Sequence, residues 1–466
     1  MAVGDGTTGT EVLVIGGGPG GYVAGIRAGQ LGHEVTLVEA GAVGGTCLND
    51  GCIPSKALIS ATDIAHRAGA AERLGVHADP AVDLAAMVGW KDRLVGRLTT
   101  GVESLLEGVG VTVIEGRAEF NSETEARVVH DGEGQGSETV SFEHAVVATG
   151  SRPVELPSVP FDGDRVLSSQ GALGLETVPD SLAVVGAGYI GMELATVYAK
   201  LGADVTVLEQ LADALPRYGD DLTRVVRERA AEVGVDFRFE SGVEGCEPRR
   251  SEVRLDTGDG TVTAERCLVA VGREPVTDTA GLGAAGVGTD DEGFVHTDDQ
   301  GRTTQETVFA VGDVAGEPML AHAAFREGEV AAEAIDGQPA ALDSQAVPAA
   351  VFTDPEVATV GLTEQAAREE GFEPAVGEMP LRASGRALTL DEQEGFVRVV
   401  ADAEHGFVLG AQAVGPEASE LVAEVTLAVE MGATLADLAA TVHVHPTLSE
   451  TVHEAAMGAL DRSVHY

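Results

Sequence analysis

Two of the four cysteines lie five positions apart in the segment GGTCLNDGCIPSK, residues 44–56. In a regular α-helix, Cα atoms at this spacing are roughly 8–9 Å apart, whereas a disulfide requires less than about 7 Å. A bond between Cys47 and Cys52 would therefore need an irregular backbone, which Gly51 can provide. Such a strained and easily reduced bond suits a redox centre better than a structural crosslink.

The cysteine spacing alone leaves two other interpretations open. The residues could be two buried free thiols, or they could form half of a zinc site. A zinc site needs a second ligand pair at a suitable spacing, and the remaining cysteines, Cys246 and Cys267, are isolated in the sequence. The flanking motifs must therefore decide between these alternatives.

A glycine-rich turn precedes the cysteine segment. The apolar run at 11–15 predicts a buried parallel strand, and residues 22–31 are expected to form a helix. A second strand is expected at 34–38, with Glu39 directly after it. Between the first strand and the helix stands G-x-G-x-x-G, formed by Gly16, Gly18 and Gly21. This arrangement brings backbone N–H groups and a helix N-terminus to a pyrophosphate, and Glu39 can accept hydrogen bonds from a ribose. The segment predicts a dinucleotide site.

The same pattern occurs again 170 residues later. A strand at 182–185 leads into Gly186, Gly188 and Gly191, and the following helix and strand end at Glu209. The recurrence indicates a duplicated nucleotide-binding unit. A carboxylate at Glu209 would accept a bond from a ribose 2′-hydroxyl and repel a 2′-phosphate, so NAD is favoured over NADP.

The remaining segments suggest how the units are connected. Strands followed by small-residue turns are expected at 144–153, 268–275 and 307–313, and Asp313 is either a ligand for a cofactor hydroxyl or a turn residue. A linker is expected at 333–348. Strands at 350–352, 395–400 and 406–414, with helices at 419–431 and 449–460, predict a final α+β module. The expected domains are 1–152, 153–274, a return segment 275–345, and 346–466.

A histidine motif lies near the C-terminus. Pro446 disfavours a helical conformation at His445, and Glu450 follows within reach of that ring. A carboxylate that orients an imidazole is the arrangement a general base needs. Two alternatives remain: a metal site formed by His443, His445 and His453, or a purely structural histidine pair.

The charge composition indicates the cellular environment. There are 76 acidic and 29 basic residues, a net charge of −47, and only three of the basic residues are lysines. Because the Debye length falls to about 3 Å at 1 M salt, such self-repulsion is tolerable in concentrated salt. We expect a cytoplasmic protein of an extreme halophile, the alternative being an ordinary acidic cytosolic protein. A signal peptide, a membrane span, a nucleic-acid partner and a disulfide-stabilised secreted scaffold are not expected.

Together these motifs resemble the dimeric flavin disulfide reductases, most closely those that oxidise dihydrolipoyl groups. The most specific matches are Gly44–Leu58 (GGTCLNDGCIPSKAL), Gly186–Leu194 (GAGYIGMEL), Met319–His322 (MLAH) and His445–Glu450 (HPTLSE). The resemblance covers the chain from about residue 10 to the C-terminus. It implies an α/β fold with two Rossmann-like, three-layer β/β/α nucleotide-binding domains and a C-terminal α+β dimerisation domain.

The resemblance also implies roles for individual residues. Cys52 would be the charge-transfer thiolate beside the flavin and Cys47 the interchange thiol, while Lys56 pairs with Glu193. His445 and Glu450 would serve the active site of the other subunit, so the enzyme would be a homodimer. The residues implied for FAD are Gly16, Gly18, Gly21, Glu39, Thr46, Lys56, Thr149, Gly150, Asp313, Met319, Leu320, Ala321 and His322. Those implied for NAD are Gly186, Gly188, Tyr189, Ile190, Gly191, Glu209 and Gly272.

The implied reaction oxidises dihydrolipoyl groups to the lipoyl disulfide and reduces NAD+. Its partners would be lipoyl domains of 2-oxoacid dehydrogenase or glycine cleavage complexes. A glutathione- or mercuric-reductase-like enzyme is the alternative, but Glu209 disfavours NADP and the chain has no C-terminal cysteine pair. A scaffold without catalysis is disfavoured by the intact cysteine and histidine motifs. One departure is Asp50, whose charge would raise the pKa of the thiols if it faced them.

Overall fold

The strand that leads into the first glycine turn is buried on both of its faces. The structure, a computed structural model, describes residues 7–130 and 136–466. In β1 (Thr7–Ile15), Val12 and Val14 join an apolar cluster on the helical side, while Leu13 and Ile15 join a second cluster on the opposite side. A strand covered on both faces reads as a continuous apolar run, as these residues do.

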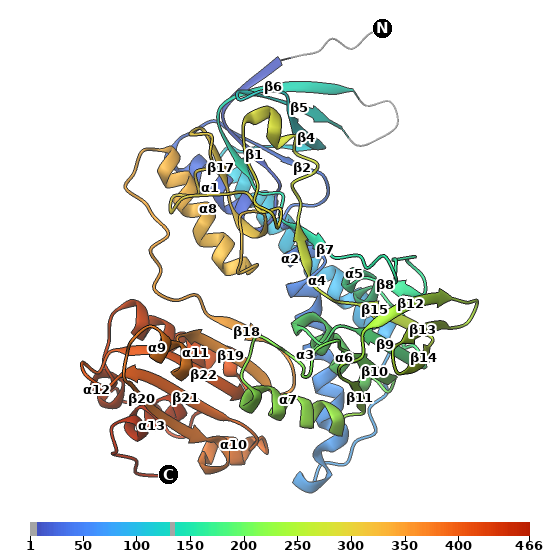
Figure 1. Cartoon of the computed structure of the whole chain (residues 1–466), viewed down its shortest axis with the longest axis vertical. Helices are drawn as coiled ribbons and strands as arrows, with labels where there is room; N and C mark the ends of the chain where they lie inside the picture. Colours follow the sequence, from blue (N-terminus) through green and yellow to red (C-terminus); the bar gives the residue numbers. More distant parts are fainter. Residues whose placement is uncertain (1–6, 131–135) are drawn as a thin grey trace.

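The N-terminal unit is a three-layer structure (Figure 1). Its sheet has the order β3-β2-β1-β6-β5-β4, and β17 also pairs with β6. The strands are β2 (Val35–Glu39), β3 (Thr112–Glu115), β4 (Arg117–Phe120), β5 (Glu125–Val129), β6 (Ser137–Val147) and β17 (Val308–Ala310). Helices α1 (Pro19–Leu31), α4 (Leu84–Gly108) and α8 (Ala321–Ile335) cover one face, and the antiparallel β4–β6 part covers the other.

The cysteine segment forms two consecutive helices. Cys47 lies in the short α2 (Gly45–Asn49), and Cys52 is the first residue of the long α3 (Cys52–Ala70). Between them, Gly51 has φ −137° and ψ −104°, values far from an α-helix. The backbone is therefore irregular between the cysteines, as their spacing requires if they are to meet.

The second unit repeats the three-layer design. Its sheet has the order β11-β10-β9-β15-β8, with strands β8 (Val166–Leu167), β9 (Ser181–Val185), β10 (Asp204–Leu208), β11 (Val235–Arg238) and β15 (Arg266–Val269). Its helices are α5 (Ser169–Leu173), α6 (Tyr189–Lys200) and α7 (Asp220–Glu232). The other face is covered by an antiparallel meander that the sequence reading did not anticipate: β12 (Val243–Pro248), β13 (Val253–Thr257) and β14 (Gly260–Ala264). These short strands are half polar, so their apolar pattern is weak.

The two crossings between the units pair with each other. β7 (Ser151–Pro153) and β16 (Arg273–Pro275) form a small antiparallel sheet. The chain then returns to the N-terminal unit through the 3-10 turns Leu282–Ala285 and Gly312–Val314. The sequence predicts a linker at 333–348, but its first residues belong to a helix, because the last turn of α8 reaches Ile335. Three alanines in that turn and the one before it, Ala331, Ala332 and Ala334, are buried, which explains why small residues there belong to the helix.

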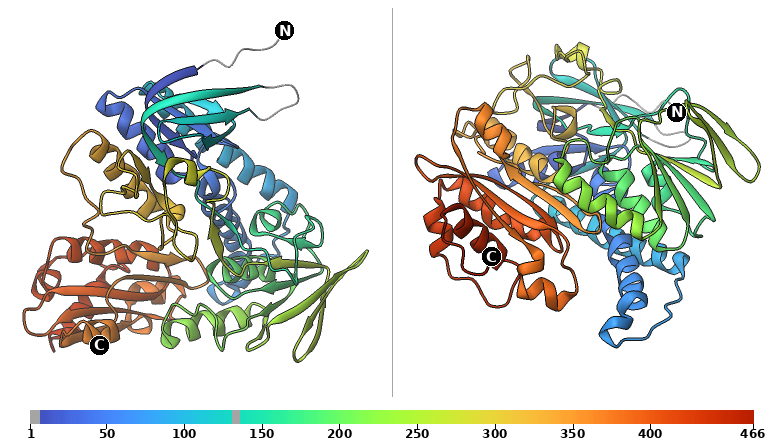
Figure 2. Two further views of the ribbon diagram at one scale, coloured as in Figure 1. Left: turned by 45° about the horizontal axis from the view of Figure 1, so that its top comes forward. Right: turned by 60° about the horizontal axis from the view of Figure 1, so that its bottom comes forward.

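The C-terminal unit is an antiparallel sheet in the order β18-β19-β22-β21-β20. Its strands are β18 (Ala349–Val351), β19 (Glu356–Gly361), β20 (Pro374–Pro380), β21 (Phe396–Asp402) and β22 (Val408–Gly415), and its helices are α9 (Glu364–Glu369), α10 (Gly385–Leu390), α11 (Ala418–Glu430), α12 (Leu435–Ala440) and α13 (Glu450–Ala459). The sequence reading missed β19 and β20. Both views of Figure 2 show this unit beside α7, and Arg398 of β21 pairs with Asp221 of α7 at 2.6 Å. The fold class is confirmed.

Across 7–130 and 136–466, the structure contains no helix with both the length and the apolar content needed to traverse a bilayer.

Candidate functional site

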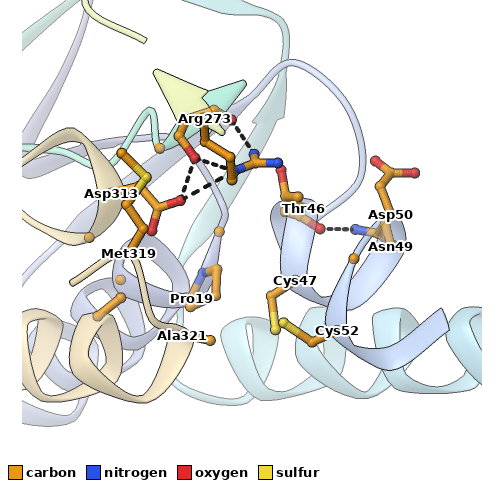
Figure 3. A pocket seen from close by; sticks show the side chains of 18 of the residues that line it. Pro19, Thr46, Cys47, Asn49, Asp50, Cys52, Arg273, Asp313, Met319 and Ala321 are labelled. Carbon is orange, nitrogen blue, oxygen red and sulfur yellow. Dashed lines mark hydrogen bonds and ion pairs between the residues drawn. The ribbon is translucent and has the colours of Figure 1, made fainter. Parts of the chain in front are cut away.

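Cys47 and Cys52 face each other at the wall of a cavity of about 480 Å³ (Figure 3). The two side chains are in contact, so the Cys47 thiol can donate a hydrogen bond to the Cys52 sulfur when Cys52 is ionised. Cys47 is half-buried and Cys52 is exposed to the cavity. The bend at Gly51 therefore brings together two sulfurs that a continuous helix would separate.

The two thiols have opposite acidities. The hydrogen bond from Cys47 lowers the pKa of Cys52 to about 7, and the nearby Lys56 ammonium adds to this effect. The same hydrogen bond, together with burial, raises the pKa of Cys47. Because a thiolate is the reactive form, the pair consists of one thiol that ionises near neutral pH and one that stays protonated.

Lys56 connects the cysteine helix to the second unit. Its Nζ lies 2.8 and 3.0 Å from the two carboxylate oxygens of Glu193, which is buried in α6. The same ammonium lies 4.5 Å from the centre of the Phe352 ring, and the Phe352 N–H donates to Glu193 Oε1 at 2.9 Å. A buried carboxylate is thus fully partnered, and a positive charge is held near Cys52.

The cavity is lined by most of the residues that the resemblance assigned to FAD and to catalysis, together with Tyr189 and Ile190, which it assigned to NAD. Those on its wall are Gly16, Gly18, Glu39, Thr46, Cys47, Cys52, Lys56, Thr149, Gly150, Tyr189, Ile190, Glu193, Asp313, Met319 and Ala321. Other predicted residues do not line it: Gly21, Leu320, His322, Gly186, Gly188, Gly191, Glu209, Gly272, His445 and Glu450. His322 instead makes a 2.7 Å hydrogen bond between its Nε2 and the Pro348 carbonyl.

The first glycine turn leaves open space where a phosphate would lie. Gly16 has φ +103°, and a Cβ there would lie 2.2 Å from the Ala148 carbonyl oxygen. By contrast, a Cβ at Gly18 would meet nothing closer than 3.9 Å. Glu39 braces the turn by accepting the Gly17 N–H at 2.5 Å and the Gly41 N–H at 2.7 Å. The turn is therefore built for close approach of a ligand at Gly18 and at the N-terminus of α1.

The second glycine turn has the same construction. Gly186 has φ +100°, and a Cβ at Gly188 would meet no atom within 4 Å. Glu209 accepts the Ala187 N–H at 2.8 Å and the Leu211 N–H at 2.9 Å, the positions that correspond to the partners of Glu39. The duplicated motif is therefore duplicated in its hydrogen bonds as well as in its glycines.

Asp313 belongs to a network whose other members the sequence reading missed. Its carboxylate accepts the Ser151 hydroxyl and lies 3.9 Å from Arg273 Nε. Arg273 also donates to the Ser151 side chain and carbonyl, each at 2.7 Å (Figure 3). Ser151 and Arg273 are the first residues of the paired strands β7 and β16. Each residue follows a predicted strand and a turn of small residues, and these two turns are the sequence signal that could have identified the network.

His445 is oriented by Glu450. Its Nδ1 lies 2.9 Å from Glu450 Oε1, while 81% of the histidine side chain is exposed. Burial alone would raise the pKa of Glu450, but hydrogen bonds from the Thr447 N–H and from His445 lower it overall. The ring is thus fixed at one nitrogen, and its other nitrogen is free to act at a surface.

The neighbouring histidines have a separate arrangement. His443 pairs with Glu424 at 2.9 Å, and its ring centre is 5.6 Å from that of His453. Among the residues that the structure describes, no three His, Cys, Asp or Glu side chains are arranged to hold a metal ion. Cys246 and Cys267, isolated in the sequence, pack in one apolar cluster behind the second sheet.

Asp50 is directed away from the two sulfurs (Figure 3). Its Oδ1 accepts a hydrogen bond from Gln170 Nε2 at 2.8 Å. The thiol acidities described above have other causes, chiefly the contact between the cysteines themselves. The Asp50 carboxylate therefore accepts a hydrogen bond from α5 and does not face the thiols.

Comparison with known proteins agrees with this site. Residues 10–328 match the family model described as pyridine nucleotide-disulphide oxidoreductase, and residues 347–456 match its dimerisation domain. Over its whole length the chain is 64% identical to dihydrolipoyl dehydrogenase 2 of Haloarcula marismortui, covering all of that protein. It is 59% identical to the dihydrolipoyl dehydrogenase of Halobacterium salinarum and 45% identical to that of Geobacillus stearothermophilus, covering 99% of each.

Solved structures have the same architecture. LpdA from Mycobacterium tuberculosis superposes with a TM-score of 0.90 at 30% identity, over 96% of this chain and 99% of that chain. The HOCl-induced flavoprotein disulfide reductase RclA from Escherichia coli gives a TM-score of 0.86 at 26% identity, with the same coverage. The chain belongs to the pyridine nucleotide-disulphide oxidoreductase family, and within it to the dihydrolipoyl dehydrogenases.

Proposed function

We propose that this protein oxidises the dihydrolipoyl group of lipoyl proteins to the cyclic disulfide through Cys47 and Cys52, with FAD and NAD+ as cofactors. The observation that carries the proposal is that the two contacting cysteines, the first glycine turn and the Lys56–Glu193 pair line one cavity. A disulfide reductase needs these three parts within one site, because electrons must pass directly between sulfur and nucleotide.

The residues around this cavity fit FAD. Gly18 and the N-terminus of α1 would receive the pyrophosphate, Glu39 the ribose, and Asp313 a ribityl hydroxyl. Lys56 would lie beside the flavin ring on the side of Cys52. When bound, FAD supplies the two-electron relay between the cysteine pair and NAD+.

The proposed thiol chemistry begins at Cys47 in the oxidised enzyme. One dihydrolipoyl thiol, having lost its proton to solvent, attacks Cys47 Sγ as a thiolate; the Cys47–Cys52 bond breaks, and Cys52 leaves as a thiolate. The second dihydrolipoyl sulfur then attacks the lipoyl sulfur of this mixed disulfide. The lipoyl ring closes, Cys47 leaves, and two electrons remain on the cysteine pair. Cys52 suits the role of leaving group because its pKa is lowered to about 7.

The proton of the second dihydrolipoyl thiol would be removed by His445 of the partner subunit. Within one chain, His445 and Glu450 do not line the cavity of Cys47, while the His445 ring is 81% exposed. Val442 and Val444, next to it, are 95% and 75% exposed, which favours burial of this segment in a homodimer. The matched dimerisation domain supports the same arrangement.

The second glycine turn would bind NAD+ in preference to NADP+. Each oxygen of Glu209 already accepts one backbone N–H and retains a lone pair for a ribose hydroxyl. Tyr189 and Ile190 start α6 at this turn and also line the cavity, so they would stand between the nicotinamide site and the flavin site.

The physiological partner would be a lipoyl domain of a 2-oxoacid dehydrogenase or glycine cleavage complex. The net charge of −47 and the two haloarchaeal relatives favour a cytoplasm with molar salt as its location.

The function is tested by mixing the protein with dihydrolipoamide in molar KCl and following NADH formation at 340 nm, with NADP+ as the competing acceptor. We expect rapid NADH formation that is abolished in Cys47→Ser. If dihydrolipoamide is inert and NADPH instead reduces another disulfide, such as glutathione disulfide, both the substrate and the role of Glu209 are wrong.

A further inference from the structure

The three lysines of this chain each connect different structural units. Lys56 of α3 pairs with Glu193 of α6, and Lys91 of α4 donates to the Leu173 carbonyl of α5 at 2.9 Å. Lys200, the last residue of α6, lies 2.6 Å from Asp63 of α3 and 2.7 Å from Asp354 of the C-terminal unit. The side chains of Lys91 and Lys200 are only 8% and 4% exposed. Lysine thus occurs where a compact ammonium with three donors is enclosed by partners.

Two of these lysines form a repeated contact between the same two helices. Lys56 and Asp63 are seven residues apart on α3, and their partners Glu193 and Lys200 are seven residues apart on α6. Seven residues are two helical turns, about 10.5 Å along the axis. The two ion pairs therefore join parallel helices at two points the same distance apart on each helix. In one pair α3 supplies the cation, Lys56, and in the other α6 supplies it, Lys200.

The C-terminal unit takes part in both ion pairs. The Phe352 N–H donates to Glu193 at 2.9 Å, and the Asp354 carboxylate contacts Lys200. These residues lie two positions apart in the segment between β18 and β19. A displacement at Lys200 is thereby coupled to the surroundings of Lys56 through α3, α6 and this segment.

The charges around Lys200 make its ammonium necessary. Asp63 and Asp354 contact it directly, and Arg229 lies 3.3 Å from Asp354. Burial would raise the pKa of Asp354, but its contacts with Lys200, together with the charges of Arg229 and His66, lower it overall. His66 and Glu392 also face this group. Without Lys200, two carboxylates with only partial access to solvent would repel each other across the α3–α6 contact.

We propose that Lys200 is a positioning residue for the redox centre, because its pairs with Asp63 and Asp354 set the register of α3 against α6 that brings Lys56 to Glu193 beside Cys52. The proposal rests on the proposed function in that Cys52 is taken as the flavin-side thiol. The titratable groups that face Cys52 are Cys47 and Lys56 from the cysteine segment, and Glu193 and Tyr189 from α6. A change in register therefore acts on Cys52 through the Lys56–Glu193 pair, while the neutral Tyr189 hydroxyl adds no charge.

The test compares Lys200→Met with Lys200→Arg and with Lys91→Met, a matched loss of a buried lysine at another unit boundary. Reduced protein is alkylated with iodoacetamide across pH 5–10, and modification of Cys52 is followed by peptide mass spectrometry. Dihydrolipoamide kcat/KM and the thermal midpoint are measured in parallel. In Lys200→Met we expect the Cys52 profile to move up by about one pH unit, with alkylation at pH 7 falling roughly fivefold to tenfold. Lys200→Arg keeps the positive charge but not the compact ammonium, so its Cys52 profile should lie between those of wild type and Lys200→Met.

Lys91→Met should lower the thermal midpoint without moving the Cys52 profile. If Lys200→Met behaves in the same way, with an unchanged profile and kcat/KM, Lys200 is only structural and the proposal is wrong. Should Lys200→Met fail to fold, Asp354→Asn decides: a smaller upward shift supports the proposal, and an unchanged profile overturns it. Wild-type protein that is inactive with dihydrolipoamide would instead refute the proposed function, whatever the alkylation profiles show.

Discussion

Lys56 Nζ lies 2.8 Å from Glu193 Oε2, although 137 positions separate the two residues in the sequence. The pair joins the helix that begins at Cys52 to the helix that begins at Tyr189, the two sides of the cavity. A buried carboxylate and a cation near the reactive sulfur are thus parts of one contact, so stability and thiol acidity depend on the same side chain.

Lys56→Met should raise the pKa of Cys52 above its value of about 7, because the cation that favours the thiolate is lost. The Cys52 alkylation profile of reduced protein should therefore move to higher pH. The variant leaves Glu193 buried without its cation, which we expect to lower the free energy of unfolding by about 3 kcal/mol, the lower end for a broken buried pair because Lys56 is 30% exposed. Denaturant titration in molar KCl measures this loss, with Arg97→Met, on the exposed side of α4, as the control. A Cys52 profile that stays near pH 7 would contradict the role assigned to Lys56.

His445→Gln should reduce dihydrolipoamide oxidation by about 10²–10⁴-fold, the range for loss of a general base. Glu450→Gln should have a smaller effect in the same direction, because it loosens the ring without removing it. NADH oxidation by an artificial dye needs no proton transfer from a thiol and should be nearly unchanged in both variants. Equal loss of both activities would mean that the histidine acts through folding or dimer formation.

Mixed dimers distinguish catalysis within one chain from catalysis between chains. Cys47→Ser and His445→Gln chains are each inactive as homodimers, but a hybrid dimer contains one site with Cys47 from one chain and His445 from the other. We expect differently tagged hybrids, purified after refolding together, to recover up to about half of wild-type turnover. Hybrids without activity would place His445 beside Cys47 of its own chain.

Glu209→Gln should weaken the preference for NAD+ over NADP+. The substitution removes the negative charge that opposes a 2′-phosphate and one of the two backbone hydrogen bonds made by the carboxylate. A charge-assisted hydrogen bond contributes roughly 1.5–3 kcal/mol, so the ratio of kcat/KM values should fall by about tenfold or more. Glu244→Gln removes an equal charge from an exposed site on β12 and is the matched control. An unchanged ratio would show that Glu209 only braces the turn.

Thermal stability should rise steeply with KCl. At a net charge of −47, repulsion is strong at 0.1 M salt, where the Debye length is about 10 Å, and much weaker at 1 M, where it is about 3 Å. Calorimetry at fixed pH between 0.2 and 3 M KCl should therefore show an increasing midpoint. Sucrose, which carries no charge, should stabilise the protein less at equal water activity. Equal effects of the two would indicate stabilisation by solvent exclusion rather than by screening.

The local motifs were readable from the sequence because each is contiguous and depends on its own backbone. The glycine turns at Gly16 and Gly186 need a positive φ and no Cβ, and the break at Gly51 is required by the spacing of Cys47 and Cys52. These requirements can be inferred from residue type and spacing alone. The same is true of His445 and Glu450, which are close enough in sequence for one side chain to reach the other.

Contacts between distant residues were decided only by the tertiary structure. The Arg273–Ser151–Asp313 network and the Lys200–Asp63–Asp354 cluster each join residues more than a hundred positions apart. No local propensity encodes such pairs, because their energy arises only once packed helices and strands remove the charges from water. The domain limits at 152/153 and 274/275 stay a prediction, close to the paired strands β7 and β16. The chemical groups and their local turns thus follow from residue type and spacing, whereas which groups meet depends on burial and packing.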